Sequence, residues 1–143
     1  MLILRPATAA DVNYIYDFLC ELESEVFDFE IFKSIFIRNL QNPDCHYILA
    51  FDEALCIGYG SLHAQCLLHH CGKVGEIQEL FVSSDYRSRG VGALLLRELE
   101  AIALREKLLL LEVTPNQQRT DAIRFYERYG LQTTHFKLVK KLI

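Results

Sequence analysis

The sequence predicts an α+β domain in which a mixed, mostly antiparallel sheet is flanked by helices. Alternating apolar and β-branched residues mark neighbouring strands over residues 46–52 and 55–66. Apolar side chains at helical spacing mark residues 93–107 as an amphipathic helix. The predicted order of elements, β-α-α-β-β-β-α-β-α-β, suits a single α+β domain with a mostly antiparallel sheet.

The first part of the chain predicts a strand and two helices. A strand over residues 2–5 leads into a helix over residues 9–23, for which Thr8 and Asp11 provide a start resembling a capping box. A second helix over residues 28–41 carries its apolar side chains on one side, as an ordinary core-facing helix does.

The second part predicts strands and helices in alternation. Gly130 is placed to end the last helix, because glycine tolerates the left-handed conformation found after helix ends. The expected elements are a loop at 67–73, a strand at 76–82, a glycine loop, the helix at 93–107, a strand at 108–113, a helix at 121–131 and a terminal pair of short strands within 131–143.

Composition bounds the function. The 143 residues, 51% hydrophobic and 24% charged, suit one domain spanning residues 1–143, with no internal repeat or linker. No apolar run approaches the length of a membrane span, and the N-terminus lacks the pattern of a signal peptide, so a cytoplasmic location is expected. A net charge of −4 with scattered basic residues argues against nucleic acid as a partner.

The five cysteines form no C-x-x-C pair and are odd in number. We expect unpaired structural thiols in a reducing compartment. Cys66, His69, His70 and Cys71 form a local cluster, but their spacing matches no usual zinc site. No structural metal is therefore expected.

Residues 76–92 are the most informative segment, because they combine a strand, a basic glycine loop and the start of a helix. Gly90 and Gly92 allow the backbone to approach a ligand closely. The free N–H groups and dipole of a helix N-terminus favour phosphate, and Arg87 and Arg89 add positive charge. The segment predicts a phosphate-bearing cofactor.

Two common phosphate motifs are excluded by the residues in and after the glycine loop. A nucleoside-triphosphate loop requires Lys and then Ser or Thr after its last glycine, whereas Gly92 precedes Ala93. A dinucleotide fingerprint requires three glycines and a distant acidic residue. The pattern Arg-x-x-Gly-x-Gly-Ala over residues 87–93 instead resembles the acyl-CoA pyrophosphate loop of the GNAT superfamily of N-acetyltransferases.

Other segments extend this resemblance over essentially the whole chain. Residues 5–11 are similar to the opening strand and helix of the superfamily, and residues 121–131, with their Phe-Tyr pair, are similar to its fourth helix. The resemblance implies a GNAT-like fold, acetyl-CoA as cosubstrate and direct acetyl transfer to an amine in a ternary complex. It also makes a homodimer possible, because family members are often dimers.

The resemblance implies a set of cofactor-binding residues, of which the last two depart from the family spacing. The superfamily's usual asparagine position is occupied here by Arg119, and Asn116 lies three residues earlier. Arg119 is open to two roles, contact with cofactor phosphate or with an acidic substrate. The implied cofactor residues are Leu80, Phe81, Val82, Arg87, Ser88, Arg89, Gly90, Val91, Gly92, Ala93, Asn116 and Arg119.

Two glutamates are candidates for the general base. An alkylamine with a pKa of about 10.4 is neutral in roughly one molecule per few thousand at pH 7, so a base within reach aids attack. Glu76 lies six residues before Val82, where some superfamily members carry their base, and is favoured over Glu79. Either carboxylate has the alternative of a salt bridge on the sheet or of contact with water.

Tyr126 is the candidate proton donor for the leaving thiolate. It belongs to the Phe-Tyr pair and matches a tyrosine that many superfamily members place near the cofactor sulfur. A phenol pKa of about 10 suits a thiolate whose conjugate acid has a pKa of about 8.5. The resemblance also assigns backbone N–H groups near Leu80 and Val82 to the thioester carbonyl.

The acceptor is open among several classes. Residues 67–80, 119–126 and 134–137 resemble aminoalkylphosphonate N-acetyltransferases, which are helped by divalent metal. A phosphonate would require cationic partners, for which the candidates are His69, His70, Lys73, Arg119 and His135.

Two other functions stay open beside a small-molecule N-acetyltransferase. A protein or peptide N-acetyltransferase would use an open acidic groove, and the acidic run over residues 21–30 could steer a cationic substrate. A non-catalytic acyl-CoA-binding or regulatory domain is disfavoured by the presence of Glu76, Tyr126 and an intact glycine loop.

Overall fold

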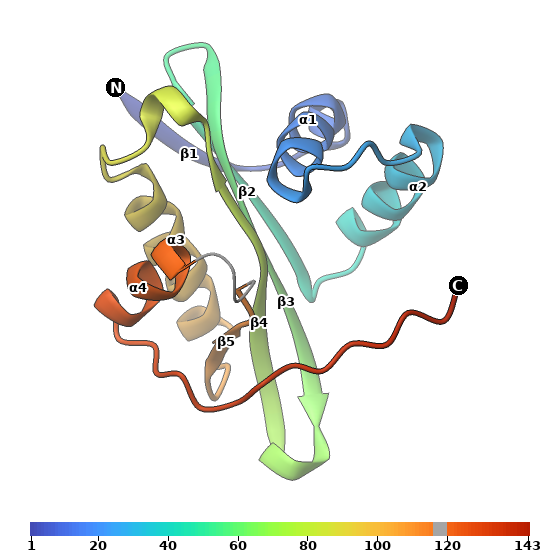
Figure 1. Cartoon of the computed structure of the whole chain (residues 1–143), viewed down its shortest axis with the longest axis vertical. Helices are drawn as coiled ribbons and strands as arrows, with labels where there is room; N and C mark the ends of the chain where they lie inside the picture. The colour runs from blue at the N-terminus through green and yellow to red at the C-terminus, as the bar shows by residue number, and fades with distance from the viewer. Residues whose placement is uncertain (116–119) are drawn as a thin grey trace.

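A computed structural model describes residues 1–115 and 120–143 of the chain (Figure 1). Three short 3-10 turns occur at Ala9–Asp11, Leu68–His70 and Ser84–Tyr86. The main elements are β1 (Leu2–Pro6), α1 (Val12–Glu23), α2 (Phe29–Leu40), β2 (Cys45–Asp52), β3 (Leu55–Leu67), β4 (Gly72–Val82), α3 (Val91–Arg105), β5 (Leu111–Val113) and α4 (Thr120–Arg128).

The five strands form one sheet in the order β1-β2-β3-β4-β5. The pairs β1·β2, β2·β3 and β3·β4 are antiparallel, whereas β4 and β5 run parallel. Helices α1 and α2 lie on one side of the sheet, and α3 and α4 lie on the other (Figure 1). The predicted fold class is therefore confirmed.

Each face of the sheet has its own apolar core. On the side of α3, Leu95 and Leu99 are fully buried against the sheet. Gly58 and Gly60 in β3 let α3 approach closely, since an added Cβ would lie 3.1 Å from Leu95 and 3.2 Å from Leu99 respectively. On the side of α1 and α2, Tyr59 is fully buried in a second, aromatic-rich core.

Strand β4 carries an irregularity that matters for the site. Its register with β3 shifts between Ser61 and Leu62, so that Ile77 and Glu79 are paired in β3 while Gln78 is the extra residue of a β-bulge. The parallel pairing with β5 ends at Ile77. Beyond that point, the second half of β4 is paired within the described residues by β3 alone.

The start of α1 is fixed by a buried carboxylate. Both oxygens of Asp11 accept hydrogen bonds from Arg5, at 2.8 and 3.0 Å. Asp11 also accepts from the backbone N–H and the hydroxyl of Thr8, at 2.7 and 3.1 Å. The predicted link between Thr8 and Asp11 is confirmed, although a 3-10 turn precedes the α-helix.

The prediction of terminal strands over residues 131–143 is wrong. This segment is extended but unpaired, and Phe136 and Leu138 are 81% and 94% exposed. An apolar sequence forms a strand only where a neighbour completes its backbone hydrogen bonds, and no described strand lies in register with it.

The boundaries of three further elements differ from the predicted ones. The strand predicted at 108–113 is reduced to β5, and the helix predicted at 93–107 begins and ends two residues earlier as α3. Strand β4 begins at Gly72 and therefore takes in part of the predicted loop at 67–73. Among the described residues, none of the helices has both the length and the apolar character needed to cross a bilayer.

Candidate active site

A cavity of about 540 Å³ lies between the end of β4, the glycine loop and α4. Leu80 and Val82 of β4 form one wall, because alternate residues in this part of the strand face α3. Arg87, Ser88, Gly90, Gly92 and Ala93 form the loop end of the cavity, and Ala122, Phe125, Tyr126, Arg128 and Tyr129 form the α4 wall.

The glycine loop is shaped to present backbone groups. Gly90 is the N-cap of α3 with φ of 82°, and no atom lies within 4 Å of where its Cβ would be. Ser88 also has a positive φ, 64°. Arg87 donates from Nε to the carbonyl oxygen of Val82 at 2.9 Å, which ties the loop to the end of β4. The N-terminus of α3 thus opens at the basic end of the cavity.

The structure brings most of the predicted cofactor residues together. Phe81 and Val91 are exceptions, because their side chains are buried in the core. Arg89 lies outside the cavity lining, with its guanidinium 5.3 Å from the ring centre of Tyr86. Asn116 and Arg119 lie outside the described residues.

Sequence reasoning missed four residues in and directly after α4 that line the cavity. Their signal is helical spacing, since Ala122, Phe125 and Tyr129 share the face on which Tyr126 lies. The fourth, Arg128, adds a second basic side chain to the lining. The combination of apolar walls with a basic, glycine-rich end fits a ligand that has an apolar chain and a phosphate group.

Tyr126 is almost fully buried at 7% exposure, and its pKa is raised to about 12 by burial. The phenol therefore stays protonated throughout the physiological range. It is suited to donating a hydrogen bond to a thiolate. Complete proton transfer is less favourable than the ordinary phenol pKa of about 10 suggested.

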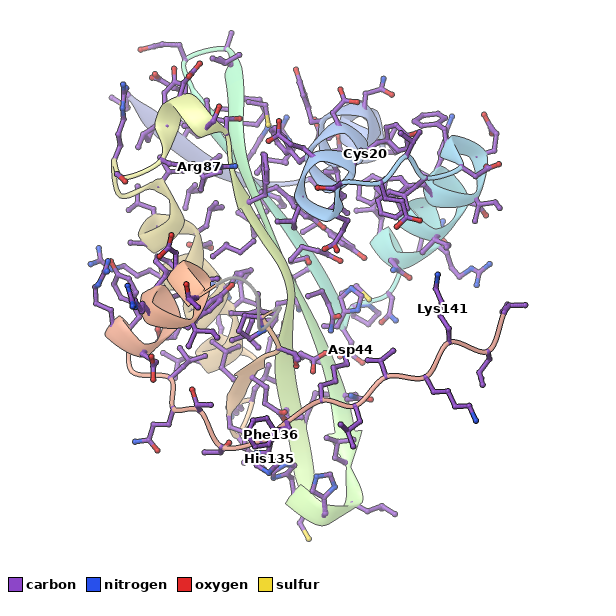
Figure 2. The ribbon with its side chains drawn as sticks, viewed as in Figure 1. Cys20, Asp44, Arg87, His135, Phe136 and Lys141 are labelled. Carbon is purple, nitrogen blue, oxygen red and sulfur yellow. The ribbon has the colours of Figure 1, made fainter. Side chains whose placement is uncertain are left out.

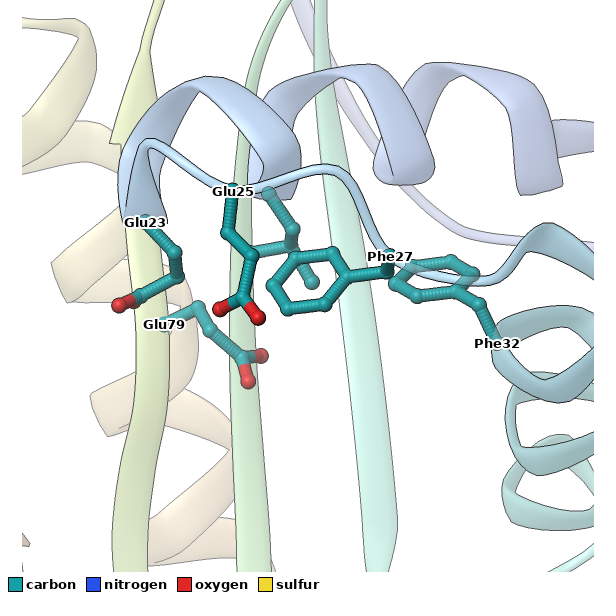
Figure 3. A pocket seen from close by; sticks show the side chains of 6 residues that line it. Glu23, Glu25, Phe27, Phe32 and Glu79 are labelled. Atoms are coloured by element: carbon teal, nitrogen blue, oxygen red, sulfur yellow. The ribbon is translucent and has the colours of Figure 1, made fainter.

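A second cavity, of about 370 Å³, lies on the other side of β4, next to the loop between α1 and α2 (Figure 3). Leu19, Phe27 and Phe32 provide its apolar wall. Glu23, Glu25 and Glu79 provide the polar groups, and Figure 3 shows the carboxylates of Glu25 and Glu79 near each other, whereas that of Glu23 points away from them. None of the described residues that line this cavity is basic.

Glu79 is held at this cavity by two fully buried hydroxyl groups. Tyr59 donates to Glu79 Oε1 at 3.0 Å, and the hydroxyl of Ser61 donates to the same oxygen. The Glu79 backbone N–H donates in turn to Ser61 Oγ at 3.2 Å. Burial, and then the nearby Glu79 charge, raise the pKa of Tyr59 well above its usual value, so this phenol remains a donor.

Sequence reasoning missed Tyr59 and Ser61. Their signal was the alternation Gly58-Tyr59-Gly60-Ser61, in which small residues face the helix α3 and hydroxyl-bearing residues face the other side.

Glu76 lies on the same strand but outside the lining of the second cavity. Its Oε1 atom accepts a hydrogen bond from Gln78 Nε2 at 2.9 Å. Across the sheet it is paired with His63, whose Nε2 is 3.0 Å from the hydroxyl of Tyr47.

The cationic residues predicted for a phosphonate are dispersed, apart from Arg119, which lies outside the described residues. His69 and His70 pack on each other at the tip of the β3–β4 hairpin, with ring centres 4.3 Å apart. Lys73 forms an ion pair of 2.6 Å with Asp44, and His135 lies on the extended C-terminal segment (Figure 2). Within residues 1–115 and 120–143, no group of three or more His, Cys, Asp or Glu side chains is placed to hold a metal ion.

Comparison with known proteins places this fold in an enzyme family. The profile of the acetyltransferase (GNAT) family matches residues 12–131, a range that includes the β4 and glycine-loop residues of both cavities. The chain belongs to this family. The recognition of an N-acetyltransferase from sequence is thereby confirmed.

This GNAT chain resembles known proteins both in sequence and in fold. An aminoalkylphosphonate N-acetyltransferase of Salmonella typhimurium is 40% identical over 139 residues, which cover 97% of this chain and 90% of the relative. A transcriptional regulator from Bacillus halodurans, 21% identical, superposes with a TM-score of 0.91 over 99% of this chain and 100% of its own.

A glucosamine-6-phosphate N-acetyltransferase from Arabidopsis thaliana, 18% identical, superposes with a TM-score of 0.84 over 100% of this chain and 99% of its own. At these low identities, the two solved structures establish the fold alone.

Proposed function

We propose that this protein transfers the acetyl group of acetyl-CoA to the primary amine of a small molecule, by direct attack within a ternary complex. The observation that carries the proposal is the presence of two cavities on opposite sides of one strand. Leu80 and Val82 face the basic, glycine-rich cavity, whereas Glu79 faces the acidic one. The end of β4–β5 pairing at Ile77 leaves the backbone of β4 beside both cavities without a strand on that side among the described residues.

In this proposal the first cavity receives acetyl-CoA. Backbone N–H groups of Gly90, Val91 and Gly92 at the start of α3 bind the pyrophosphate, with Arg87 and Ser88 beside them. The pantetheine chain lies along Leu80 and Val82, where free backbone groups of β4 polarise the thioester carbonyl. Arg89, Ala93, Asn116 and Arg119 complete the proposed cofactor set.

We assign the general base to Glu79. The sequence favoured Glu76, but Glu79 lines the acceptor cavity and is fixed by Tyr59 and Ser61. Glu79 takes a proton from the bound ammonium group, directly or through one water, and leaves a neutral amine. Glu76 is the second candidate, acting through solvent from an earlier position on β4.

The remaining step conserves atoms and charge. The amine nitrogen forms a bond to the acetyl carbon, and the bond between that carbon and sulfur breaks with its electrons on sulfur. The nitrogen, positively charged after attack, releases its extra proton to solvent, and the thiolate takes up one proton from solvent. Tyr126 donates a hydrogen bond to the leaving thiolate, which its raised pKa suits. The products are the N-acetylated amine, coenzyme A and one proton, and no cysteine of the chain forms an acyl intermediate.

One relative provides evidence on the class of the acceptor. The relative that is 40% identical over 97% of this chain is an aminoalkylphosphonate N-acetyltransferase, which supports a small aminoalkyl substrate. A peptide acceptor is the alternative, because the exposed acidic residues Glu23 and Glu25 border the acceptor cavity. A non-catalytic acyl-CoA-binding domain would need the first cavity, but it would not need a carboxylate such as Glu79 held in place in the second.

The proposal is tested by thiol release from acetyl-CoA in the presence of aminoethylphosphonate, alkyl amines, polyamines, amino acids and a basic peptide. Each amine is assayed with added magnesium and with a chelator, and acetyl-CoA binding is measured by calorimetry in parallel. Turnover with a small amine supports the proposal. Binding of acetyl-CoA without turnover of any amine would overturn it in favour of a binding domain, and turnover of the peptide alone would overturn the small-molecule assignment.

A further inference from the structure

The acceptor cavity carries more negative charge than acetyl transfer requires. One carboxylate, Glu79, is enough to accept the proton of the reacting amine. Glu23 and Glu25 supply two more, and both are exposed at the rim of the cavity. With no basic residue among its described lining, the cavity favours cationic over anionic ligands.

The end of α1 adds to this negative potential. Glu23 is the last residue of α1, and Ser24 turns the chain into the left-handed conformation with φ of 51°. The C-terminal end of a helix carries partial negative charge from its unpaired carbonyl groups, which favours cations. The end of α1 at this cavity therefore carries partial negative charge, like the carboxylates of the lining.

The basic groups described near this cavity are engaged with other partners. Arg87, on the glycine loop, is 3.9 Å from Glu21 and donates its Nε hydrogen to the carbonyl of Val82. Lys73 is paired with Asp44, far along β4. A phosphonate or carboxylate entering the cavity would meet three negative side chains and would lose hydration without gaining a described cationic partner.

The opposite wall is apolar. Phe27 and Phe32 stack with ring centres 6.2 Å apart, and Leu19 of α1 continues the surface. Together with Tyr16, which packs against Phe32, these rings form a firm wall suited to a hydrocarbon chain. The lining thus combines an alkyl-binding surface with separate groups for two ammonium ions.

From these contacts we infer that the preferred acceptor is an alkyl diamine. One amino group lies at Glu79 and is acetylated, the methylene chain packs on Phe27 and Phe32, and the second ammonium group lies at Glu25, with Glu23 adding negative charge at the rim. This inference rests on the proposed function, since it names the substrate class of the same active site. It also departs from the substrate named for the 40% identical relative, because none of the described residues that line this cavity is cationic, as a phosphonate would need.

The test compares kcat/KM for acceptors of similar length and different distal charge: putrescine, butylamine, γ-aminobutyrate and aminoethylphosphonate. The expected order is putrescine first, butylamine about tenfold lower, and the two anionic amines lowest. The double variant Glu23→Gln/Glu25→Gln should reduce the preference of putrescine over butylamine to about threefold or less, because kcat/KM falls further for the dication than for the monocation. The matched control is Glu98→Gln/Glu100→Gln on α3, which changes net charge equally outside the cavity and should retain the preference.

Two results would overturn the inference while leaving the proposed function in place. One is equal kcat/KM for putrescine and butylamine, and the other is preferred turnover of aminoethylphosphonate, with or without magnesium, that is unaffected by Glu23→Gln/Glu25→Gln. Failure of the proposed function looks different, since no amine would then release thiol from acetyl-CoA.

Discussion

The fully buried hydroxyl of Tyr59 donates a 3.0 Å hydrogen bond to the carboxylate of Glu79, across the strand pair β3·β4. Ser61 donates to the same oxygen from two residues further along β3. These two bonds fix the direction of the Glu79 side chain toward the acceptor cavity before any substrate arrives. A positioned base needs this kind of support, because small displacements of a reacting group lower the rate sharply.

Replacing Glu79 by glutamine should lower kcat by roughly 100-fold, since a general base typically contributes a factor of that size. The affinity for acetyl-CoA, measured by calorimetry, should stay unchanged because Glu79 does not line the cofactor cavity. Glu76→Gln is the matched variant on the same strand and should retain most of the wild-type rate. Full activity of Glu79→Gln together with a large loss in Glu76→Gln would reverse the assignment of the base.

Tyr126→Phe should lower kcat by about tenfold or more, because the thiolate loses its hydrogen-bond donor. Since burial raises the pKa of Tyr126 to about 12, ionisation of this phenol should cause no fall in the wild-type rate up to about pH 10. The pH profile of kcat in both proteins is the measurement. A wild-type profile with an alkaline decline that disappears in Tyr126→Phe would show that the phenol titrates much lower.

Gly90→Ala should weaken acetyl-CoA binding by about tenfold, because a side chain at φ of 82° strains the loop that begins α3. Gly130→Ala is the matched control, with φ of 93° and equally free space around its Cβ, but it lies outside the lining of the cofactor cavity. Both variants should lose comparable stability in thermal unfolding. If both variants lost acetyl-CoA affinity equally, the loss would not come from the conformation of the glycine loop, and the proposed cofactor site would be contradicted.

The Arg5–Asp11 pair should make stability depend on pH in the acid range. Hydrogen bonding from Arg5 is the main cause that lowers the pKa of Asp11 to about 2. A lowered folded-state pKa means that the stabilisation is complete above about pH 4 and is lost as pH falls toward about 2. Its size is at most about 2 kcal/mol, reduced by solvent screening because Arg5 is partly exposed.

Asp11→Asn removes this dependence. Denaturant unfolding should show the variant less stable than wild type at neutral pH, with the difference shrinking between about pH 4 and about pH 2. A difference that stays constant over this range would mean that the carboxylate charge contributes nothing to stability.

Most of the fold could be predicted because local patterns and tertiary structure agree. The periodicity of residues 29–40 and the alternation in β2 and β3 survive in the folded chain, and Thr8 and Asp11 interact as their spacing indicated. The terminal strands failed for the opposite reason. Residues 131–143 have strand-like composition, but a strand also requires a partner edge, and sequence alone does not show whether one is present.

Sequence patterns predicted the contiguous parts of the site but not the residues that separate strands bring together. The glycine loop is contiguous, so its residues could be predicted together, and Tyr126, predicted from a motif on one helix, lines the same cavity. The supports of Glu79 come from another strand, and the bulge at Gln78 sets which side chains share a face. Tyr59 and Ser61 therefore required the strand register, which a sequence pattern does not specify.

The central claim is that acceptor and cofactor occupy opposite sides of β4 at the same time. Initial-rate kinetics with both acetyl-CoA and amine varied test this most directly. Double-reciprocal lines that intersect would show that a ternary complex forms before any product leaves, as the two cavities require. Parallel lines, accompanied by an acetylated form of the protein in the absence of amine, would show a covalent acyl intermediate and would contradict this account.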